Sequence, residues 1–73
     1  MQFEFTNHAR RRMTQRGIGE ADVRTAIERP QHTRRSEKDL NCSLITGLAA
    51  DGQRRIVVTV ASGSRPLRIV SVR

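Results

Sequence analysis

The sequence predicts an α+β domain in which an N-terminal helical hairpin packs on one face of a three- to four-stranded antiparallel β-meander. Apolar side chains recur at helical spacing over residues 7–29, and Gly17 interrupts them. Three β-branched runs follow at residues 42–49, 54–61 and 67–72, separated by turn sequences. The 73 residues form a single domain, and a chain of this size buries only about 60% of its unfolded surface. We therefore expect a partner, or a second copy in a homodimer, to add stability.

Residues 1–6 are expected to form an extended arm or an edge strand, because two phenylalanines alternate there with polar neighbours. Thr6 or Asn7 then supplies the N-cap of a helix over residues 7–16, since its side-chain oxygen can accept a free backbone N–H. Gly17 favours the left-handed conformation that ends a helix.

A second helix is expected to begin after Gly19, with two acidic residues near the positive end of its dipole. Pro30 ends it, because proline cannot donate a backbone hydrogen bond and disfavours helical geometry in the preceding residue. The two helices would form a tight hairpin with Gly17 at its corner. We interpret the charged segment 31–41 as an edge strand followed by a turn, with a mobile loop as the alternative.

Turn positions predict the register of the meander. A two-residue turn at Asp51-Gly52 would place Ile45 opposite Val58, and one at Gly63-Ser64 would place Val58 opposite Ile69. One sheet face, which the helices should cover, then carries Ile45, Ile56, Val58, Val60, Leu67 and Ile69. The other carries Thr46, Leu48, Arg55, Val57, Thr59, Arg68, Val70 and Val72. This second face is a candidate surface for a ligand or a protein partner, with ordinary β-propensity on an exposed face as the alternative.

The net charge of +7 at pH 7 indicates an acidic partner, nucleic acid first and an acidic protein second. Of the 14 basic residues only Lys38 is a lysine, and arginine binds phosphate oxygens in pairs where lysine acts as a point charge. The alternative is that arginine content follows from genome base composition and serves solubility. A lone cysteine, Cys42, indicates a reducing compartment, and no apolar run reaches the length of a membrane span. We expect a cytoplasmic protein with no membrane partner.

His8, Arg12 and Arg16 are expected to lie on one side of the first helix, because each step of four residues advances by only about 40° around the axis. Ala9 and Met13 form a neighbouring apolar stripe that docks on the core and holds the charged stripe at its rim. One imidazole and two guanidinium groups would then form a site for a phosphate.

Each of these residues also has a structural explanation. His8 alone is better explained as a first-turn histidine that hydrogen-bonds its own helix end or packs against a strand. Arg12 and Arg16 can instead form ion pairs across the helical hairpin, and their candidate partners are Glu20, Asp22 and Glu28. Their shared face is what favours a functional role.

The pattern of His8, Ala9, Arg12, Met13, Arg16, Gly17 and Ile18, followed by an acidic helix, Pro30 and a β-meander, resembles the domain-of-unknown-function family 4258 from Phe5 onward. That family is similar in outline to small nucleases of the barnase, EndoU, colicin and RelE type, and stands close to the BrnT-like and RelE-like toxins of bacterial toxin–antitoxin pairs. The resemblance implies a domain that cleaves RNA and is held inactive by an acidic antitoxin. The chain has no tyrosine, and only Phe3 and Phe5 could stack a base, which argues against ribosome-dependent cleavage of the RelE type.

Metal-free cleavage of RNA needs a base for the 2′-hydroxyl, cations for the phosphorane charge and an acid for the leaving oxygen. On the family motif, His8 transfers protons while Arg12 and Arg16 bind the phosphate. The second proton-transfer group would come from His32, Glu37 or Asp39. Further nucleic-acid contacts are expected from Arg11, Arg34, Arg35, Arg55 and Arg68, with Arg55 and Arg68 also candidates to reinforce the phosphate site.

Histidines at positions 8 and 32 and a cysteine at position 42 have no metal-ligand spacing, so we expect neither a metal nor another cofactor. Two further interpretations compete with the ribonuclease. One is a non-catalytic basic module that binds nucleic acid or regulates through a protein partner. The other is a degenerate family member that survives as a structural or assembly subunit.

Overall fold

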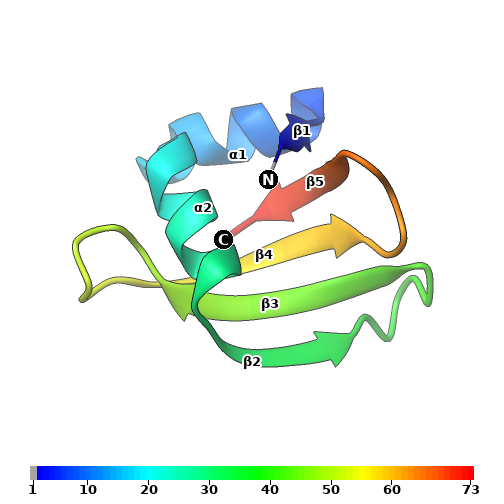
Figure 1. Cartoon of the computed structure of the whole chain (residues 1–73). Coiled ribbons are helices and arrows are strands. Elements are labelled where there is room, and N and C mark those ends of the chain that lie inside the picture. Colours follow the sequence, from blue (N-terminus) through cyan, green and yellow to red (C-terminus); the bar gives the residue numbers. More distant parts are fainter. Residues whose placement is uncertain (1) are drawn as a thin grey trace.

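A five-stranded mixed sheet with two helices on one of its faces forms the computed structural model, which describes residues 2–73 (Figure 1). In chain order the elements are β1 (Phe3–Phe5), α1 (Asn7–Arg16), α2 (Glu20–Glu28), β2 (Pro30–Arg35), β3 (Cys42–Leu48), β4 (Arg55–Ala61) and β5 (Leu67–Val72). The strands lie in the order β1-β5-β4-β3-β2. The predicted α+β class is confirmed.

The expected antiparallel sheet of three to four strands is wrong in one respect, because β1 adds a fifth strand that is parallel to β5. Phe3 lies opposite Leu67, and Phe5 lies opposite Ile69. Almost the whole chain lies between β1 and β5 in sequence. Because no short turn connects these two strands, they are free to pair in parallel. The predicted edge strand within residues 1–6 is thus present at Phe3–Phe5, while residue 1 lies outside the described residues. At the opposite edge, β2 confirms the strand expected after the second helix.

The first predicted hairpin has the correct register, since Ile45 faces Val58. Its connection is longer than two residues, because β3 ends at Leu48 and β4 begins at Arg55. Inside this loop the Asp51 carboxylate accepts two backbone hydrogen bonds, which hold the turn closed. The loop includes two more residues than predicted on each side of Asp51-Gly52. Because the extension is symmetric, the predicted strand register is unchanged.

The second predicted hairpin has the wrong register, because Val58 faces Val72 instead of Ile69, which is a shift of three residues, and Ile69 faces Val60. The connection between β4 and β5 spans residues 62–66 instead of two residues, which shifts β5 along β4. The register also changes between Thr59 and Val60, where β5 contains one extra residue. As a result, Val72 lies in the core with 1% of its surface exposed, whereas the sequence placed it on the opposite face.

Helix α1 has the predicted bounds, and identifiable groups satisfy both of its ends. At the start, the Thr6 hydroxyl accepts a hydrogen bond from the N–H of Ala9 at 3.1 Å. At the end, Gly17 adopts the left-handed conformation with φ of 65°. The guanidinium of Arg54 donates to the carbonyls of Arg16 and Gly17, which places a cation at the negative end of the helix dipole.

The tight helical hairpin is wrong in its packing, because α1 packs on β5 while α2 packs on β3 and β4. Each helix buries residues against the sheet, Ala9 and Met13 from α1 and Val23 and Ala26 from α2. The Asp22 carboxylate accepts hydrogen bonds from the N–H groups of Gly19 and Ala50, both at 2.9 Å. It therefore ties the start of α2 to the β3–β4 loop.

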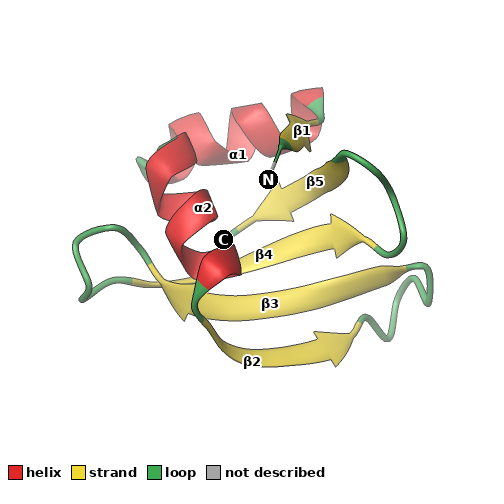
Figure 2. Ribbon diagram, viewed as in Figure 1, coloured by secondary structure: helices red, strands yellow, loops and turns green. Residues whose placement is uncertain are grey.

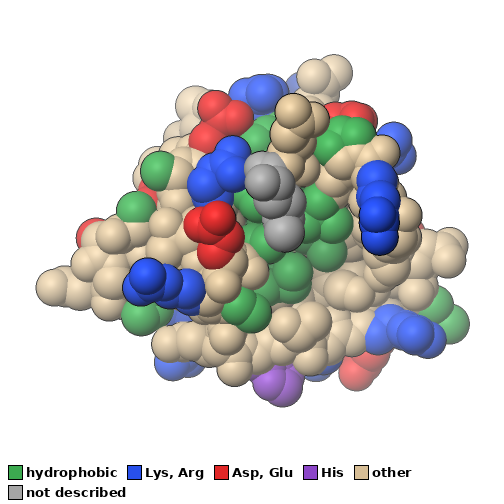
Figure 3. Space-filling model, in the orientation of Figure 1, with side chains coloured by type: hydrophobic (Ala, Val, Ile, Leu, Met, Phe, Trp, Pro, Cys, Tyr) green, Lys and Arg blue, Asp and Glu red, His purple; other side chains and the backbone are tan. Residues whose placement is uncertain are grey.

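The core lies between the helices and the sheet (Figure 2) and contains Ala9, Met13, Ile18, Val23, Ala26, Ala49, Ile56, Val58, Val60, Ile69 and Val72. Four of the six residues predicted for the helix-covered sheet face belong to this core. The other two, Ile45 and Leu67, are half-buried and pack against it. Two short helices do not cover the whole face. Hydrophobic side chains consequently gather at the centre of the view in Figure 3, with Lys and Arg side chains around them.

Candidate functional site

A groove of about 460 Å³ lies on the sheet face opposite the helices. Leu44 and Thr59 face each other at its floor, and both alternate along their strands with residues that point toward the helices. The side chains that line it are His8, Arg34, Ser36, Glu37, Lys38, Asp39, Cys42, Leu44, Thr59, Val70, Ser71 and Arg73. The groove therefore occupies part of the face that the sequence marked as a ligand surface.

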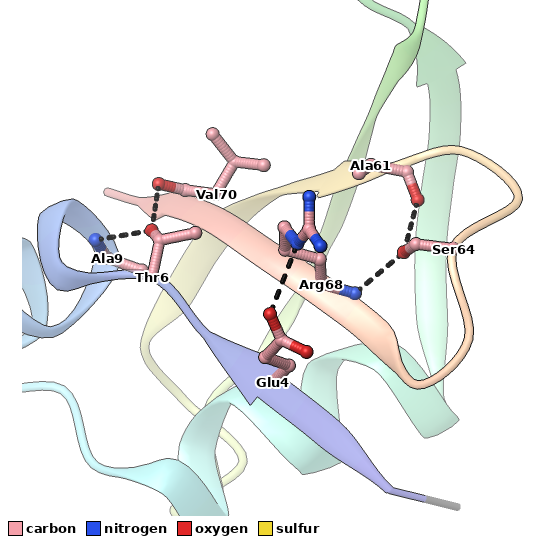
Figure 4. Close-up of polar contacts among 7 residues, drawn as sticks. All are labelled: Glu4, Thr6, Ala9, Ala61, Ser64, Arg68 and Val70. Atoms are coloured by element: carbon pink, nitrogen blue, oxygen red, sulfur yellow. Dashed lines mark hydrogen bonds and ion pairs between the residues drawn. The ribbon is translucent and has the colours of Figure 1, made fainter.

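The start of α1 is fixed to β5 through Thr6 (Figure 4), and the first turn of this helix carries His8, which lines the groove. The Thr6 hydroxyl donates to the carbonyl of Val70 at 3.1 Å, and the Thr6 N–H donates to the carbonyl of Ile69 at 3.1 Å. Strand β1 ends at Phe5, so the first turn of α1 lies beside the last part of β5. Within residues 2–73 the exposed His8 side chain makes no hydrogen bond or ion pair, which leaves both ring nitrogens available.

Three cations from different segments line the same groove. Arg34 projects from β2, where it pairs with Leu44, and Lys38 comes from the β2–β3 loop. Arg73 follows β5, and its backbone exchanges two hydrogen bonds with Val57, at 2.9 and 2.7 Å. These cations can bind an anion, because in the described part of the chain none of their side chains is engaged by a carboxylate.

Two of the three candidates for the second proton-transfer group, Glu37 and Asp39, lie in the groove, and His32 is not among its lining side chains. Asp39 is held in place, because its carboxylate accepts a hydrogen bond from the N–H of Asn41 at 2.9 Å and contacts the Cys42 sulfur at 3.7 Å. Glu37 makes no side-chain hydrogen bond within residues 2–73 and is the carboxylate that remains available.

Cys42 lies buried at the side of the groove. Burial raises the pKa of its thiol above the ordinary value, and the adjacent Asp39 carboxylate raises it further by charge and by a hydrogen bond. The raised pKa favours the neutral thiol, which is a poor nucleophile. Cys42 therefore acts as a small packing residue.

We expect folded protein to react with iodoacetamide at neutral pH more slowly than protein unfolded in urea, because burial and the raised pKa both suppress the Cys42 thiolate. Replacing Asp39 with asparagine removes a negative charge, so D39N should react faster than the parent chain while still folded. Mass spectrometry of the alkylated chain over time measures both rates. Equal rates for the two folded proteins would contradict the influence of Asp39.

Arg12 and Arg16 lie on α1 with His8, but neither lines the groove. With a rise of 1.5 Å per residue, they are about 6 and 12 Å further along the helix axis than His8. Arg12 is half-buried and Arg16 is exposed. The structure thus places His8 in one groove with Arg34, Lys38 and Arg73, and the predicted role of Arg12 and Arg16 stays a prediction.

The alternative in which Arg12 and Arg16 pair with acidic residues of α2 is not seen in the part of the chain that the structure describes. The ion pair found there joins Arg68 to Glu4 at 3.3 Å (Figure 4). Asp22 instead accepts backbone hydrogen bonds. The guanidinium groups of Arg12 and Arg16 are therefore available to an external anion.

The other arginines expected to contact nucleic acid are dispersed over the surface. Arg11 is exposed on α1, Arg35 is exposed on β2 and Arg55 is exposed at the start of β4. Arg68 is half-exposed and engaged with Glu4. Of the five, only Arg34 lines the groove.

Each of the two phenylalanine rings has an arginine guanidinium over it. The Arg10 guanidinium lies over the Phe5 ring at 5.1 Å, and the Arg24 guanidinium lies over the Phe3 ring at 4.7 Å. The rings contact each other edge to face at 6.5 Å and are half-buried against the core. These contacts reduce the ring surface on which an aromatic ligand could stack.

The fold and the groove define a small, strongly basic α+β domain with one histidine among cations. The family model described as a domain of unknown function, DUF4258, matches residues 5–73, and the chain belongs to that family. No curated protein and no solved structure matches the chain. Over residues 2–73 no helix has the length and apolar character needed to cross a membrane, and no three His, Cys, Asp or Glu side chains are grouped as a metal site requires.

Proposed function

We propose that this chain is a ribonuclease that cleaves RNA without a metal, and that the groove opposite the helices is its active site. The observation that carries the proposal is the position of His8. Its exposed imidazole lines one groove with three cations and a free carboxylate, and these are the groups that metal-free cleavage of RNA needs.

Each group has a defined role in the proposed reaction. The Glu37 carboxylate accepts the proton of the ribose 2′-hydroxyl, whose oxygen attacks the adjacent phosphorus. Arg34 and Arg73 stabilise the negative charge that develops on the phosphorane oxygens. His8 in its protonated form donates a proton to the departing 5′-oxygen. The products are a 2′,3′-cyclic phosphate and a free 5′-hydroxyl.

Arg12 and Arg16 fit this scheme as contacts to neighbouring phosphates of the same strand. They continue along α1 from His8, so a strand that enters the groove at His8 can follow the helix. Their side chains are unengaged within residues 2–73, and each neutralised phosphate adds to affinity by releasing counterions. The remaining exposed arginines add to this general attraction.

The proposal extends to a toxin of the RelE-like and BrnT-like type, which an acidic antitoxin protein holds inactive in the cell. The net charge of +7 supports an acidic protein partner as well as RNA. An acidic chain would compete with RNA for the same arginines.

The defining test uses a single-stranded RNA oligonucleotide and its all-deoxy counterpart, each incubated with purified protein in excess chelator. We expect cleavage of the RNA to products that end in a 2′,3′-cyclic phosphate, identified by mass spectrometry. The deoxy strand should bind and remain intact, because it lacks the attacking 2′-hydroxyl. Cleavage of both strands, or of neither, would reject the proposed mechanism.

The second candidate function is a non-catalytic module that binds nucleic acid. One observation favours it: Asp39, one of the two carboxylates in the groove, is already engaged by Asn41 and Cys42. Such a module would bind the RNA and the deoxy strand, with affinity that falls steeply as salt rises, and would release no products from either.

A further inference from the structure

Strand β2 is an open edge of the sheet. It is the last strand in the order β1-β5-β4-β3-β2, and all six of its residues are exposed. Figure 1 shows no described element beyond it. The edge at the other side of the sheet is β1, which has only three residues. An open edge of six residues is a surface onto which another strand can pair.

The backbone groups that face outward from this edge can be assigned from the ladder with β3. The N–H of Ser36 donates to the carbonyl of Cys42 at 2.9 Å, and the pairing is regular from Arg35 back to His32. In an antiparallel ladder, a residue directs both its N–H and its C=O to the strand on the same side. The next residue along the strand directs both groups to the opposite side. His32 and Arg34 therefore bond to β3, while Thr33 and Arg35 direct their N–H and C=O groups away from the sheet.

The side chains along this edge select the charge of an incoming strand. Arg34 projects on the groove side and Arg35 on the helix side, because successive side chains of a strand point to opposite faces. A strand that pairs with β2 would thus place two consecutive side chains beside the two guanidinium groups, one on each face. Consecutive carboxylates fit this arrangement, since opposite charges across a ladder attract and like charges repel.

We propose that the free edge of β2 takes up an extended acidic segment of a partner protein as an added sixth strand. Backbone hydrogen bonds to Thr33 and Arg35 hold the segment, and adjacent Asp or Glu side chains on it pair with Arg34 and Arg35. A second copy of this chain fits less well, because the centre of its own β2 carries the same two arginines. This interaction does not require the chain to cleave RNA.

The test uses the whole chain and an eight-residue peptide, Val-Thr-Val-Glu-Glu-Val-Thr-Val, with a matched peptide in which both glutamates are glutamines. We expect the glutamate peptide to bind about tenfold more tightly, from two cross-strand ion pairs. In amide hydrogen exchange measured by NMR, the peptide should slow exchange at Thr33 and Arg35 and leave His32 and Arg34 nearly unchanged, since those amides already bond to β3.

A pair of variants separates strand addition from simple charge attraction. Thr33→Pro removes an outward N–H without breaking a bond to β3, whereas Thr33→Ala keeps that N–H. Binding should be lost in T33P and kept in T33A, with thermal melting used to check that both fold. If T33P does not fold, the exchange pattern at Thr33 and Arg35 decides the outcome alone.

Three results would overturn the proposal. The first is equal binding of the two peptides, and the second is protection that appears in the groove instead of at Thr33 and Arg35. The third is protection of those two amides that rises with protein concentration in the absence of peptide, which would make a second copy the occupant of the edge.

Discussion

Gly47→Val is expected to lower the free energy of unfolding by about 3 kcal/mol or more, because α2 passes directly over Gly47 on β3. A Cβ atom at this position would lie 2.7 Å from the carbonyl oxygen and 2.8 Å from the Cα of Ala26. Both atoms belong to the helix backbone and cannot rotate away. With a total stability of about 4–11 kcal/mol for a domain of this size, the change removes a large share.

Urea denaturation of Gly47→Val and of the milder Gly47→Ala measures this effect. Gly19→Ser is the matched control, since a Cβ there would meet only the Asp22 carboxylate at 3.7 Å and serine is a good N-cap. Combining Gly47→Ala with Ala26→Gly should restore little stability, because the backbone contacts remain. A denaturation midpoint for G47A that equals that of the parent chain would show that α2 can move away from the sheet without cost.

The helices and the first hairpin could be predicted because their signals are local. Gly17 ends α1 through its positive φ, and Pro30 prevents α2 from continuing. The Asp51-Gly52 pair marks the centre of the β3–β4 loop. The predicted register of β3 and β4 is therefore correct, although the loop is longer than expected. In each case the residues that decide the structure are neighbours in sequence.

The pairing of β1 with β5 could not be predicted in the same way, because it joins the two ends of the chain. The extra residue in β5 is also without a local signal, and it changes which side chains after Ile69 point into the core. One consequence is the burial of Val72, and another is that Arg73 reaches the groove. Sequence reasoning missed Arg73 for this reason.

The candidate site was predicted in part. Helical spacing relates His8 only to residues of its own helix, so Arg12 and Arg16 were the cations assigned to it. Its neighbours in the groove come from β2, the β2–β3 loop and the end of β5, and only the assembled sheet brings them together. Glu37 was included as a candidate because the set of available acids and bases is small, but its position in the groove could be seen only in the structure.

His8→Ala is expected to reduce the rate of RNA cleavage by about 10²- to 10⁴-fold, which is the usual contribution of a positioned acid or base. Affinity for the uncleavable deoxy strand should remain nearly unchanged, because the phosphate contacts belong to arginines. Single-turnover cleavage and fluorescence anisotropy measure the two quantities. Folding should not suffer, since the His8 side chain is exposed and makes no hydrogen bond within residues 2–73.

Matched arginine variants show which phosphate site His8 serves. If the groove is the active site, Arg34→Ala and Arg73→Ala should lower the cleavage rate more than they lower affinity, because their guanidinium groups meet charge that develops in the transition state. Arg12→Ala and Arg16→Ala should lower affinity and leave the single-turnover rate at saturating protein nearly intact. The reverse pattern would move the reacting phosphate out of the groove and onto the stripe of α1, where the sequence alone had placed it.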